Sequence, residues 1–294
     1  MPGPTPDRPV FRFAPSPNGL LHLGHAYSAL LNLDLARATN GTLLVRLEDI
    51  DTSRCRPDLA DRMLEDLAWL GLDVRQPRRQ SEHFADYQAA LDRLAAKGLL
   101  YPSRATRKQI ATAIAPLGPD WPRDPDGAPL YPRHLVQEDP DEPAALRLDM
   151  QKAAAGISLT WQETGVGPVG ETGTVAISPT IWGDAILRRK EFPASYAIAV
   201  VVDDALQGVT HVVRGQDLFY ATALQRLLQH HLGLSPPEYH HHGLIRGDAG
   251  EKLSKSLVSK SIAAWRAEGQ TVNDLRRLLG LASATQYTSS EKRT

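Results

Sequence analysis

The sequence lacks three features that would place it in other protein classes. It has one cysteine, Cys55, which excludes an internal disulfide framework and suits a reducing compartment, so we expect a cytoplasmic protein. No apolar run approaches the roughly 18 residues that a membrane helix needs, and the opening MPGPTPDRPV is too rich in proline and charge for a signal peptide. The formal net charge is -1, so any contact with RNA must come from local positive charge.

The chain is long enough for a sizeable core. Its 294 residues, 42% of them hydrophobic, exceed the usual single domain, so we expect one domain that carries an insertion. VFRF (10–13) predicts a short strand. Residues 26–38 carry leucines at helical spacing and end at Asn40-Gly41, a good C-terminal cap, and TLLVRLED (42–49) predicts a buried strand. This βαβ order implies a parallel sheet.

The middle of the chain first continues the helical pattern and then breaks it. Residues 58–71 and 81–98 predict two helices that end at glycines, and Thr106 with Gln109 forms a capping box for a third helix. Residues 116–144 contain eight prolines and few apolar residues. This composition predicts an ordered but irregular loop inside the insertion.

Strand signals return after the proline-rich loop. ALRLDM (145–150) and ISLTWQE (157–163) predict a small antiparallel or mixed β element that extends to about residue 190. YAIAVVVDD (196–204) and THVVRG (210–215) predict buried strands, a helix over 217–233 follows, and the chain is polar and helical after that. We therefore divide the chain into the first half of a sheet domain (1–100), an inserted subdomain (101–190), the second half of the sheet domain (191–245) and a C-terminal helical region (246–294).

The turn after the first strand, RFAPSPNGLLHLGH (12–25), has the composition of an anion-binding site. In a parallel sheet, ligands bind at the carboxyl ends of the strands, where the next helix offers unpaired amide groups. His22 and His25 can donate hydrogen bonds to phosphate oxygens, Gly24 lets a nucleotide approach the backbone, and the prolines stiffen the approach. Alone, two histidines at a helix start also fit the role of caps or surface residues.

A second positively charged segment lies far downstream. EKLSKS (251–256) places Lys252 and Lys255 in a short polar loop, where two ammonium groups can neutralise the charge that develops on a triphosphate leaving group. Taken alone, these lysines would be an ordinary solvated charge cluster. In this order around a βαβ unit, the two motifs resemble the paired signatures of class I aminoacyl-tRNA synthetases.

Four separated segments extend this resemblance to the glutamyl branch of the class: RFAPSPNGLLHLGH, VRLEDID, YAIAVVVDDALQGVTHVVRGQDL and KLSKS. The resemblance implies an α/β fold, with a Rossmann-type parallel-sheet nucleotide-binding domain, an inserted α+β subdomain of the acceptor type and a short C-terminal helical region. The chain stops about 40 residues after its lysine loop. In this it is similar to the glutamyl-queuosine tRNA(Asp) synthetases, which lack an anticodon-binding domain.

The resemblance implies a two-step, ATP-dependent ligase reaction. The α-carboxylate of L-glutamate attacks the α-phosphorus of ATP to give glutamyl-adenylate without tRNA, and glutamate then passes to the queuosine base of tRNA(Asp). Mg²⁺ accompanies the ATP phosphates, and we expect a monomer that makes no contact with membranes. The implied catalytic residues are His22, His25, Lys252 and Lys255, and the implied ATP-binding residues are His22, Gly24, His25 and Lys255.

Residue chemistry independently suits glutamate as a substrate. Two carboxylates and one ammonium group call for two cations and one anion, which Arg12, Arg214 and Glu48 supply. Without the resemblance, Glu48 would also fit as a partner of Arg46, and Tyr196 as a core aromatic residue. The glutamate-binding set that the resemblance implies is Arg12, Phe13, Ala14, Pro15, Ser16, Glu48, Tyr196 and Arg214.

Signals for bound metals are weak. Many relatives carry a zinc site in the insertion with a C-x-C pair, but here Ser103 and Ala105 stand at those positions and the downstream LYPRHL has no cysteine. Serine and alanine cannot supply thiolates, so we expect no zinc. His230-His231 and His240–His242 have no thiolate or carboxylate partner at a recognisable spacing, so we do not expect a metal there either.

Two further motifs carry no function in our interpretation. GVGPVG (165–170) matches the dinucleotide pattern G-x-G-x-x-G, but the sequence after it cannot start the required helix, so we interpret it as a flexible loop in the insertion. Cys55 has no histidine in a recognisable arrangement, which indicates an incidental thiol rather than a nucleophile.

Hypotheses of other classes stay open. Another nucleotidyl transferase would share the histidine turn but activate a different acid. A truncated glutamyl-tRNA synthetase paralogue would use a different acceptor, and a non-catalytic RNA-binding module would have no physical reason to retain these histidines and lysines. The RNA side is the least determined. The candidates are Arg104, Arg107, Lys108, Arg276 and Arg277, and each also fits a solvated helix face.

Overall fold

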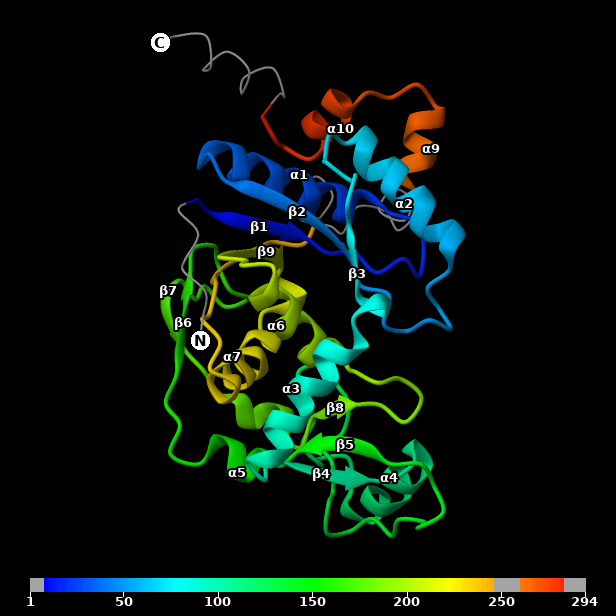
Figure 1. Ribbon diagram of the computed structural model, residues 1–294, viewed down its shortest axis with the longest axis vertical. Coiled ribbons are helices and arrows are strands. Elements are labelled where there is room, and N and C mark those ends of the chain that lie inside the picture. Colours follow the sequence, from blue (N-terminus) through cyan, green and yellow to red (C-terminus); the bar gives the residue numbers. More distant parts are fainter. Residues whose placement is uncertain (1–7, 246–259, 283–294) are drawn as a thin grey trace.

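The computed structural model describes residues 8–245 and 260–282 of the chain (Figure 1). A seven-stranded sheet has the strand order β3-β2-β1-β9-β10-β6-β7, and a separate three-stranded sheet has the order β4-β5-β8. The strands are β1 (Val10–Phe13), β2 (Thr42–Leu47), β3 (Arg78–Arg79), β4 (Leu100–Ser103), β5 (Ala145–Leu148), β6 (Thr160–Glu163), β7 (Gly173–Ala176), β8 (Ile186–Arg188), β9 (His211–Gly215) and β10 (Glu238–His242).

The large sheet is parallel up to one edge, which confirms the parallel sheet predicted from the βαβ pattern. β2 and β3 follow β1 on one side, with Val10 opposite Thr42, and β9, β10 and β6 extend the sheet in parallel on the other side. β7 closes this side antiparallel to β6. The strand order therefore reverses between β1 and β9. In parallel sheets, ligands bind at the carboxyl ends of the strands beside such a switch point.

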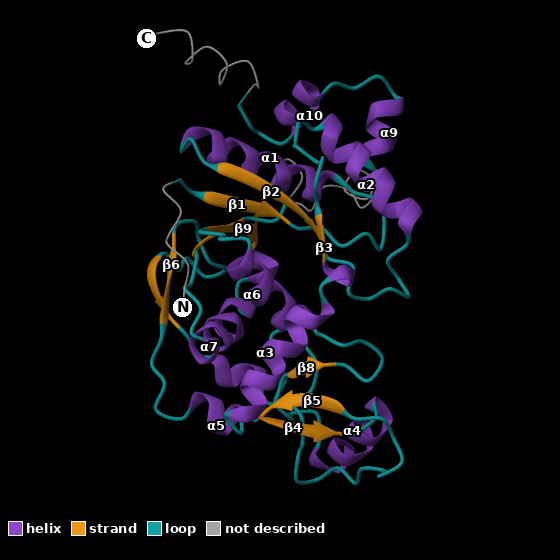
Figure 2. Cartoon of the chain, in the orientation of Figure 1, coloured by secondary structure: helices purple, strands orange, loops and turns teal. Residues whose placement is uncertain are grey.

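Helices cover both faces of the large sheet (Figure 2). One face carries α1 and α2 together with the C-terminal α9 and α10, which share a buried hydrophobic cluster. The opposite side carries α3, α6 and α7. The helices are α1 (Leu23–Ala38), α2 (Pro57–Trp69), α3 (Phe84–Ala96), α4 (Arg107–Ile114), α5 (Met150–Ala154), α6 (Tyr196–Leu206), α7 (Ala221–Leu232), α9 (Ile262–Ala267) and α10 (Val272–Leu278).

The segment YAIAVVVDD (196–204) is a helix, so our prediction of a buried strand there is wrong. It forms α6, in which Ile198, Val200 and Val201 are at most 2% exposed. A short continuous apolar run does not distinguish a buried strand from a buried helix, because both are surrounded by other elements on all sides. Here α3 and α7 provide those surroundings.

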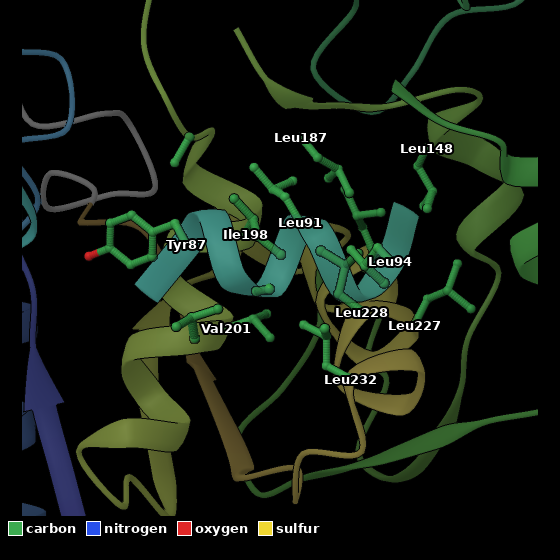
Figure 3. Close-up of a cluster of buried hydrophobic side chains, with 14 of the residues drawn as sticks. Tyr87, Leu91, Leu94, Leu148, Leu187, Ile198, Val201, Leu227, Leu228 and Leu232 are labelled. Carbon is green, nitrogen blue, oxygen red and sulfur yellow. The ribbon is translucent and has the colours of Figure 1, made fainter. Parts of the chain in front are cut away.

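The largest buried cluster joins α3, α6 and α7 to the small sheet (Figure 3). Leu91 and Leu94 of α3 lie in it beside Ile198 of α6, and Leu148 of β5 and Leu187 of β8 enter it from the small sheet. None of these side chains is more than 1% exposed. The cluster therefore fixes the position of α6. It thereby also fixes the start of that helix, at Tyr196, beside the large sheet.

The strands of the predicted insertion divide between the two sheets. β5 pairs antiparallel with β4 and β8, whereas β6 pairs with β10 and so extends the large sheet. The small β element predicted up to residue 190 is therefore two structures. α4 begins with the predicted capping box, since Thr106 and Gln109 each accept the backbone N–H of the other through their side chains, at 2.7 Å and 3.2 Å.

Residues 116–144 contain no strand or α-helix, as expected for an irregular loop, and Glu138 anchors them. Its carboxylate accepts hydrogen bonds from the hydroxyl groups of Tyr131 (2.5 Å) and Ser103 (2.9 Å) and from the backbone N–H of Arg104 (2.8 Å). Burial raises the pKa of Glu138, but these hydrogen bonds outweigh burial and the pKa is lowered. An ionised carboxylate thus ties the loop to the end of β4.

The C-terminal helices return to the first helix. The backbone N–H of Ile262 donates to the carbonyl of Leu21 (2.9 Å), and Arg276 of α10 forms two hydrogen bonds with Asp34 of α1, at 2.6 Å and 2.8 Å. Arg276 is only 1% exposed, so our suggestion that it contacts RNA is wrong, whereas Arg277 is exposed. Within residues 8–245 and 260–282 we find no helix with the length and hydrophobicity that crossing a membrane requires.

Candidate active site

A cavity of about 480 Å³ opens at the switch point between β1 and β9. Its walls come from the carboxyl ends of strands and the starts of α1 and α6. Eleven residues predicted for the site line it: Arg12, Phe13, Ala14, Pro15, Ser16, His22, Gly24, His25, Glu48, Tyr196 and Arg214. Residues that we did not predict also line it: Ser28, Val213, Gly215, Asp217, Leu218, His242, Leu244 and Ile245.

The turn between β1 and α1 is held to the end of β2 by one backbone hydrogen bond, and a second bond lies within the turn. The carbonyl of Pro15 accepts the N–H of Glu48 (2.9 Å), and the carbonyl of Ser16 accepts the N–H of Asn18 (2.8 Å). Because β1 and β2 are parallel neighbours, their carboxyl ends meet at one edge. The turn and Glu48 therefore lie side by side, although more than 30 residues separate them in the sequence.

His22 and His25 form a reciprocal cap at the start of α1. His22 Nδ1 accepts the backbone N–H of Gly24 (3.1 Å), and His25 Nδ1 accepts the backbone N–H of His22 (3.2 Å), with the ring centroids 3.9 Å apart. A neutral imidazole has one N–H, and here each Nδ1 is an acceptor, so the network assigns the proton to Nε2 in both rings. The role as helix caps and the role as donors to a ligand are therefore compatible.

Both imidazoles of this cap are neutral at physiological pH. Burial lowers the pKa of His22, and burial together with repulsion from His22 lowers the pKa of His25 to about 4. Each ring therefore offers an uncharged Nε2–H rather than a positive charge. Neutral donors at a helix N-terminus, where backbone N–H groups point the same way, suit a phosphate oxygen.

Gly24 makes room for the ring of His22. A Cβ at this position would lie 3.1 Å from Cε1 and 3.3 Å from Nδ1 of His22, closer than ordinary van der Waals contact. Since that ring is fixed by its hydrogen bond to the Gly24 N–H, a side chain here would displace it. The lack of a side chain at Gly24 therefore accommodates the His22 ring, in addition to the close nucleotide approach that the sequence suggested.

A buried ionic network lies behind Arg12 and Glu48. Arg12 Nε donates to Asp204 Oδ1 (3.3 Å), and Arg46 Nη1 donates to the same oxygen (2.8 Å). Arg46 Nη2 also donates to Glu48 Oε1 (3.4 Å), and Arg46 is completely buried. Glu48 therefore does both things that the sequence allowed: it pairs with Arg46 and it lines the cavity.

The pKa shifts in this network have clear causes. Burial raises the pKa of Glu48, and the charges of Arg46 and Arg12 offset part of that rise. Burial also disfavours the charged form of Asp204, but Arg12 and Arg46 outweigh it and lower the pKa. Burial, followed by the nearby charge of Glu48, raises the pKa of Tyr196, so this side chain keeps its hydroxyl proton as a donor.

Arg214 is 5% exposed and carries an unused donor. Its Nε donates to His241 Nε2 (3.1 Å) and its Nη2 donates to Thr222 Oγ1 (2.8 Å). Nη1 is buried and has no hydrogen-bond partner among the described residues. A guanidinium group in the wall of a cavity, with a buried and unpaired nitrogen, is suited to a carboxylate or phosphate of a ligand.

Sequence analysis missed the residues behind the cavity. Asp203 and Asp204 end the apolar run of α6, and two carboxylates attached to a buried run require partners, which was a usable signal. For His241 there was no such signal. Its partners are Glu163, 78 residues away, and Arg214, and only the pairing of β10 with both neighbouring strands brings them together.

The two predicted lysines, Lys252 and Lys255, lie outside the described residues. The described residues on either side of their segment are at the cavity. Ile245 lines it, and Ser261 forms an isolated β-bridge with His22. The part these lysines play stays a prediction.

No group of three His, Cys, Asp or Glu side chains in the described part of the chain could hold a metal ion. Ser103, one of the two residues that we compared with a zinc-binding cysteine pair, donates to Glu138. The histidines of β10 face different neighbours, His240 towards Thr164 and His241 towards Glu163.

The GVGPVG segment connects β6 to β7, and no helix follows it. It packs against the large sheet, because a Cβ at Gly165 would lie 2.3 Å from the carbonyl oxygen of His241 and the side chain of Gln216 donates to the carbonyl of Val166 (2.7 Å). Cys55 lies 3.6 Å from the hydroxyl of Ser16, and burial raises the pKa of its thiol. A raised pKa opposes the thiolate form that a nucleophile needs.

Known proteins are similar to this chain in sequence and in fold. The family of tRNA synthetases class I (E and Q), catalytic domain, matches residues 10–291. The chain is 44% identical to a glutamyl-Q tRNA(Asp) synthetase of Rhodobacter capsulatus over 92% of this chain and 100% of that protein, and 37% identical to one of Symbiobacterium thermophilum over 96% and 90%. A crystal structure of glutamate-tRNA synthetase from Elizabethkingia anophelis has a TM-score of 0.69 at 24% identity, covering 85% of this chain and 53% of that one, so this chain spans about half of that synthetase. The chain belongs to the class I tRNA synthetases for glutamate and glutamine, whose catalytic domain it contains.

Proposed function

We propose that this protein is an ATP-dependent ligase that activates L-glutamate to glutamyl-adenylate without tRNA and then transfers glutamate to the queuosine base of tRNA(Asp). The proposal is supported by relatives named glutamyl-Q tRNA(Asp) synthetase that match the chain over nearly their whole lengths. We also propose that it works in the cytoplasm and as a monomer.

The observation that carries the glutamate assignment is the charge arrangement around one cavity. Arg12 and Arg214 supply two cationic groups and Glu48 supplies an anionic group, while Asp217 adds a second carboxylate to the wall. Glutamate has two carboxylates and one ammonium group, so each of its charges finds an opposite partner. Arg214 Nη1, buried and unpaired in the described structure, is the donor that we assign to a ligand oxygen.

In the activation step, an oxygen of the glutamate α-carboxylate attacks the α-phosphorus of ATP in line with the leaving group, and the bond to the bridging oxygen breaks to release pyrophosphate. His22 and His25 would donate their Nε2–H groups to phosphate oxygens at the start of α1. These donors are fixed before the reaction, so little reorganisation is needed. Lys252 and Lys255 would neutralise the departing pyrophosphate.

Mg²⁺ fits the site as a companion of the nucleotide rather than as an ion held by a protein cage. The described residues provide no cluster of carboxylates around the cavity, and magnesium commonly keeps several waters and binds phosphate oxygens. When bound in this way, the ion offsets negative charge on the phosphates.

For the acceptor RNA, we propose contacts through the exposed Arg107 and Lys108 at the start of α4 and through Arg277 on α10. Arg104 is half-buried, and its carbonyl accepts the Nζ of Lys190 (2.8 Å). It therefore belongs to the fold of the insertion as well as to its surface.

Glutamate-dependent exchange between ATP and labelled pyrophosphate, measured without tRNA, tests the activation step. We expect exchange with glutamate and none with aspartate or glutamine. Exchange driven by another acid alone would instead identify a different nucleotidyl transferase, and no exchange with any amino acid would favour an RNA-binding module.

The transfer step is tested by charging purified tRNA(Asp) that carries or lacks queuosine. We expect labelled glutamate on the queuosine-containing tRNA alone. Nuclease digestion of the charged tRNA should place the label on the queuosine nucleoside and not on the 3′-terminal adenosine, because the two acceptors lie in different nucleosides. A label on the terminal adenosine would instead identify a paralogue that uses the terminal ribose.

A further inference from the structure

A buried acid–imidazole pair lies behind Arg214. Glu163 of β6 and His241 of β10 have side chains with no exposed surface, and Glu163 Oε2 lies 2.6 Å from His241 Nδ1. The other carboxylate oxygen, Oε1, accepts the backbone N–H groups of His241 (2.8 Å) and Gly165 (2.9 Å). Trp161 Nε1 donates to Oε2 at 3.3 Å. The carboxylate is therefore held in one orientation by four N–H groups.

These contacts determine where the proton of His241 lies. Burial raises the pKa of Glu163, but the hydrogen bonds from His241 outweigh it and the pKa is lowered, so the carboxylate is ionised. Burial lowers the pKa of His241 to about 4, so the ring is neutral. An ionised carboxylate can only accept, and Nδ1 must therefore carry the single ring proton. Nε2 then presents a lone pair.

The lone pair on His241 Nε2 faces Arg214. Arg214 Nε donates to His241 Nε2 at 3.1 Å, and Arg214 Nη2 donates to Thr222 Oγ1 at 2.8 Å. Two fixed contacts determine the plane of the guanidinium, and Nη1 is the nitrogen of this cavity-lining residue that has no partner among the described residues.

The neutral partner also leaves the charge of Arg214 available. Arg12 contacts the carboxylate of Asp204 directly, whereas no carboxylate oxygen in the described structure lies within ion-pair distance of Arg214. The carboxylate of Glu163 contacts His241, and His241 in turn contacts Arg214, so the acid acts through the imidazole. The arrangement therefore orients a cation without neutralising it in a direct ion pair.

We propose that Glu163 and His241 are positioning residues for the amino-acid substrate: Glu163 fixes the tautomer of His241, and His241 Nε2 orients Arg214 so that Nη1 binds a carboxylate of glutamate. This proposal rests on the proposed function, because it assigns the same substrate to the cavity. Neither positioning residue touches the substrate.

Two replacements of His241 separate positioning from structural support, since the pair also joins β6 to β10. Asparagine places an amide nitrogen near the position of Nδ1, so it keeps the bond to Glu163 but has no atom that reaches Arg214. Glutamine places a carbonyl oxygen near the position of Nε2, so it keeps an acceptor for Arg214 but loses the bond to Glu163. A positioning role predicts that His241→Asn loses more glutamate affinity than His241→Gln. A purely structural role predicts that His241→Gln loses more.

Calorimetry with glutamate and with ATP, together with exchange kinetics, measures the difference. His241→Asn should weaken glutamate binding about tenfold or more, the effect of a lost hydrogen bond to a charged group, with little change in the KM for ATP. His241→Gln should bind glutamate more tightly than His241→Asn does. His240→Asn, on the same strand but in contact with Thr164, is the matched control and should leave both constants unchanged.

A double variant tests whether His241 acts through Arg214. Arg214→Lys removes the planar guanidinium and its Nε–H, so adding His241→Asn to it should cause little further loss of glutamate affinity. Additive losses, a milder defect in His241→Asn than in His241→Gln, or equal changes for ATP and glutamate would overturn the positioning role while leaving the proposed function intact. Absence of glutamate-dependent exchange in the unaltered protein would overturn both.

Discussion

At the scale of single residues, the charges that face the cavity depend on partners one layer behind it. Arg12 is held by Asp204 and Glu48 by Arg46, and the two pairs share contacts through Arg46. Buried charges are stable when paired and costly when a partner is removed. The binding properties of the cavity are therefore set partly by residues that no ligand touches.

Glutamate binding should weaken on acidification at a pH above the usual carboxyl range. Burial raises the pKa of Glu48 above its ordinary value of 4.5, and its protonated form cannot attract the ammonium group of the substrate. The Kd for glutamate, measured by calorimetry between pH 7 and pH 5, should therefore rise as the pH falls. Glu48→Gln should bind weakly throughout and lack this dependence. If the Kd of Glu48→Gln for glutamate depended on pH as that of the unaltered protein does, Glu48 would be excluded as the partner of the ammonium group.

Much of the site could be predicted from sequence because its residues lie at recognisable strand ends. Arg12 is near the end of β1, Glu48 follows β2 and Arg214 is near the end of β9, and the carboxyl ends of parallel strands meet at one edge. The sequence indicates that Asp204 needs a partner but not which one, and it gives no signal for His241, because both roles depend on long-range contacts that local patterns do not contain.

At the scale of elements, the start of α1 combines a structural cap with a predicted phosphate site. The same two imidazoles close the helix through Nδ1 and leave Nε2 for a ligand. The element that sequence analysis assigned wrongly was α6, because a run of valines has the same appearance in a buried strand and in a buried helix. What decides between them is the packing of α3 and α7, which lie elsewhere in the chain.

Replacement of Gly24 by alanine should impair catalysis more than folding. The added methyl group would crowd the ring of His22, which must move by a few tenths of an ångström. Alanine is itself a better helix former than glycine, so the melting temperature should change little. We expect the kcat of pyrophosphate exchange to fall roughly tenfold, since displaced donors stabilise the transition state less well. An unchanged kcat would show that the position of the His22 ring does not matter.

Glu138→Ala should loosen the proline-rich segment without changing glutamate activation. The variant loses the acceptor for Tyr131, Ser103 and the Arg104 N–H, a change that typically costs about 1–3 kcal/mol. Limited proteolysis should cut within residues 116–144 faster than in the unaltered protein, while the KM for glutamate stays the same. Equal cleavage rates in the two proteins would mean that other contacts hold the segment.

At the scale of the whole molecule, buried neutral histidines should make folding sensitive to acid. The pKa values of His25 and His241 are about 4 in the folded protein and 6.5 ordinarily. In the window between these values the unfolded chain binds more protons, so stability falls as the pH falls from 6.5 to 4, by about 1.4 kcal/mol per pH unit for each group. Urea unfolding across this range measures the slope. His241→Gln should reduce it, and an unchanged slope in this variant would exclude His241 as a contributor.

The attachment of the C-terminal helices to α1 should depend on the ion pair between Arg276 and Asp34. Arg276→Ala leaves Asp34 buried without its partner, a loss that typically costs about 3–5 kcal/mol. Arg277→Ala, at an exposed position one residue later, is the control and should cost little. Denaturant titration compares the two, and similar midpoints would show that the pair contributes little to stability.

The return of the chain's last described residues to α1 has a genetic consequence. Helix α1, whose N-cap is His22, receives its outer cover from Ile262, Leu275 and Arg276, whose codons follow those of every described cavity residue. A nonsense mutation shortly before that point would leave every codon for the described cavity residues intact, yet it would expose the buried side of that helix to water. Such an allele should behave as a complete loss of function.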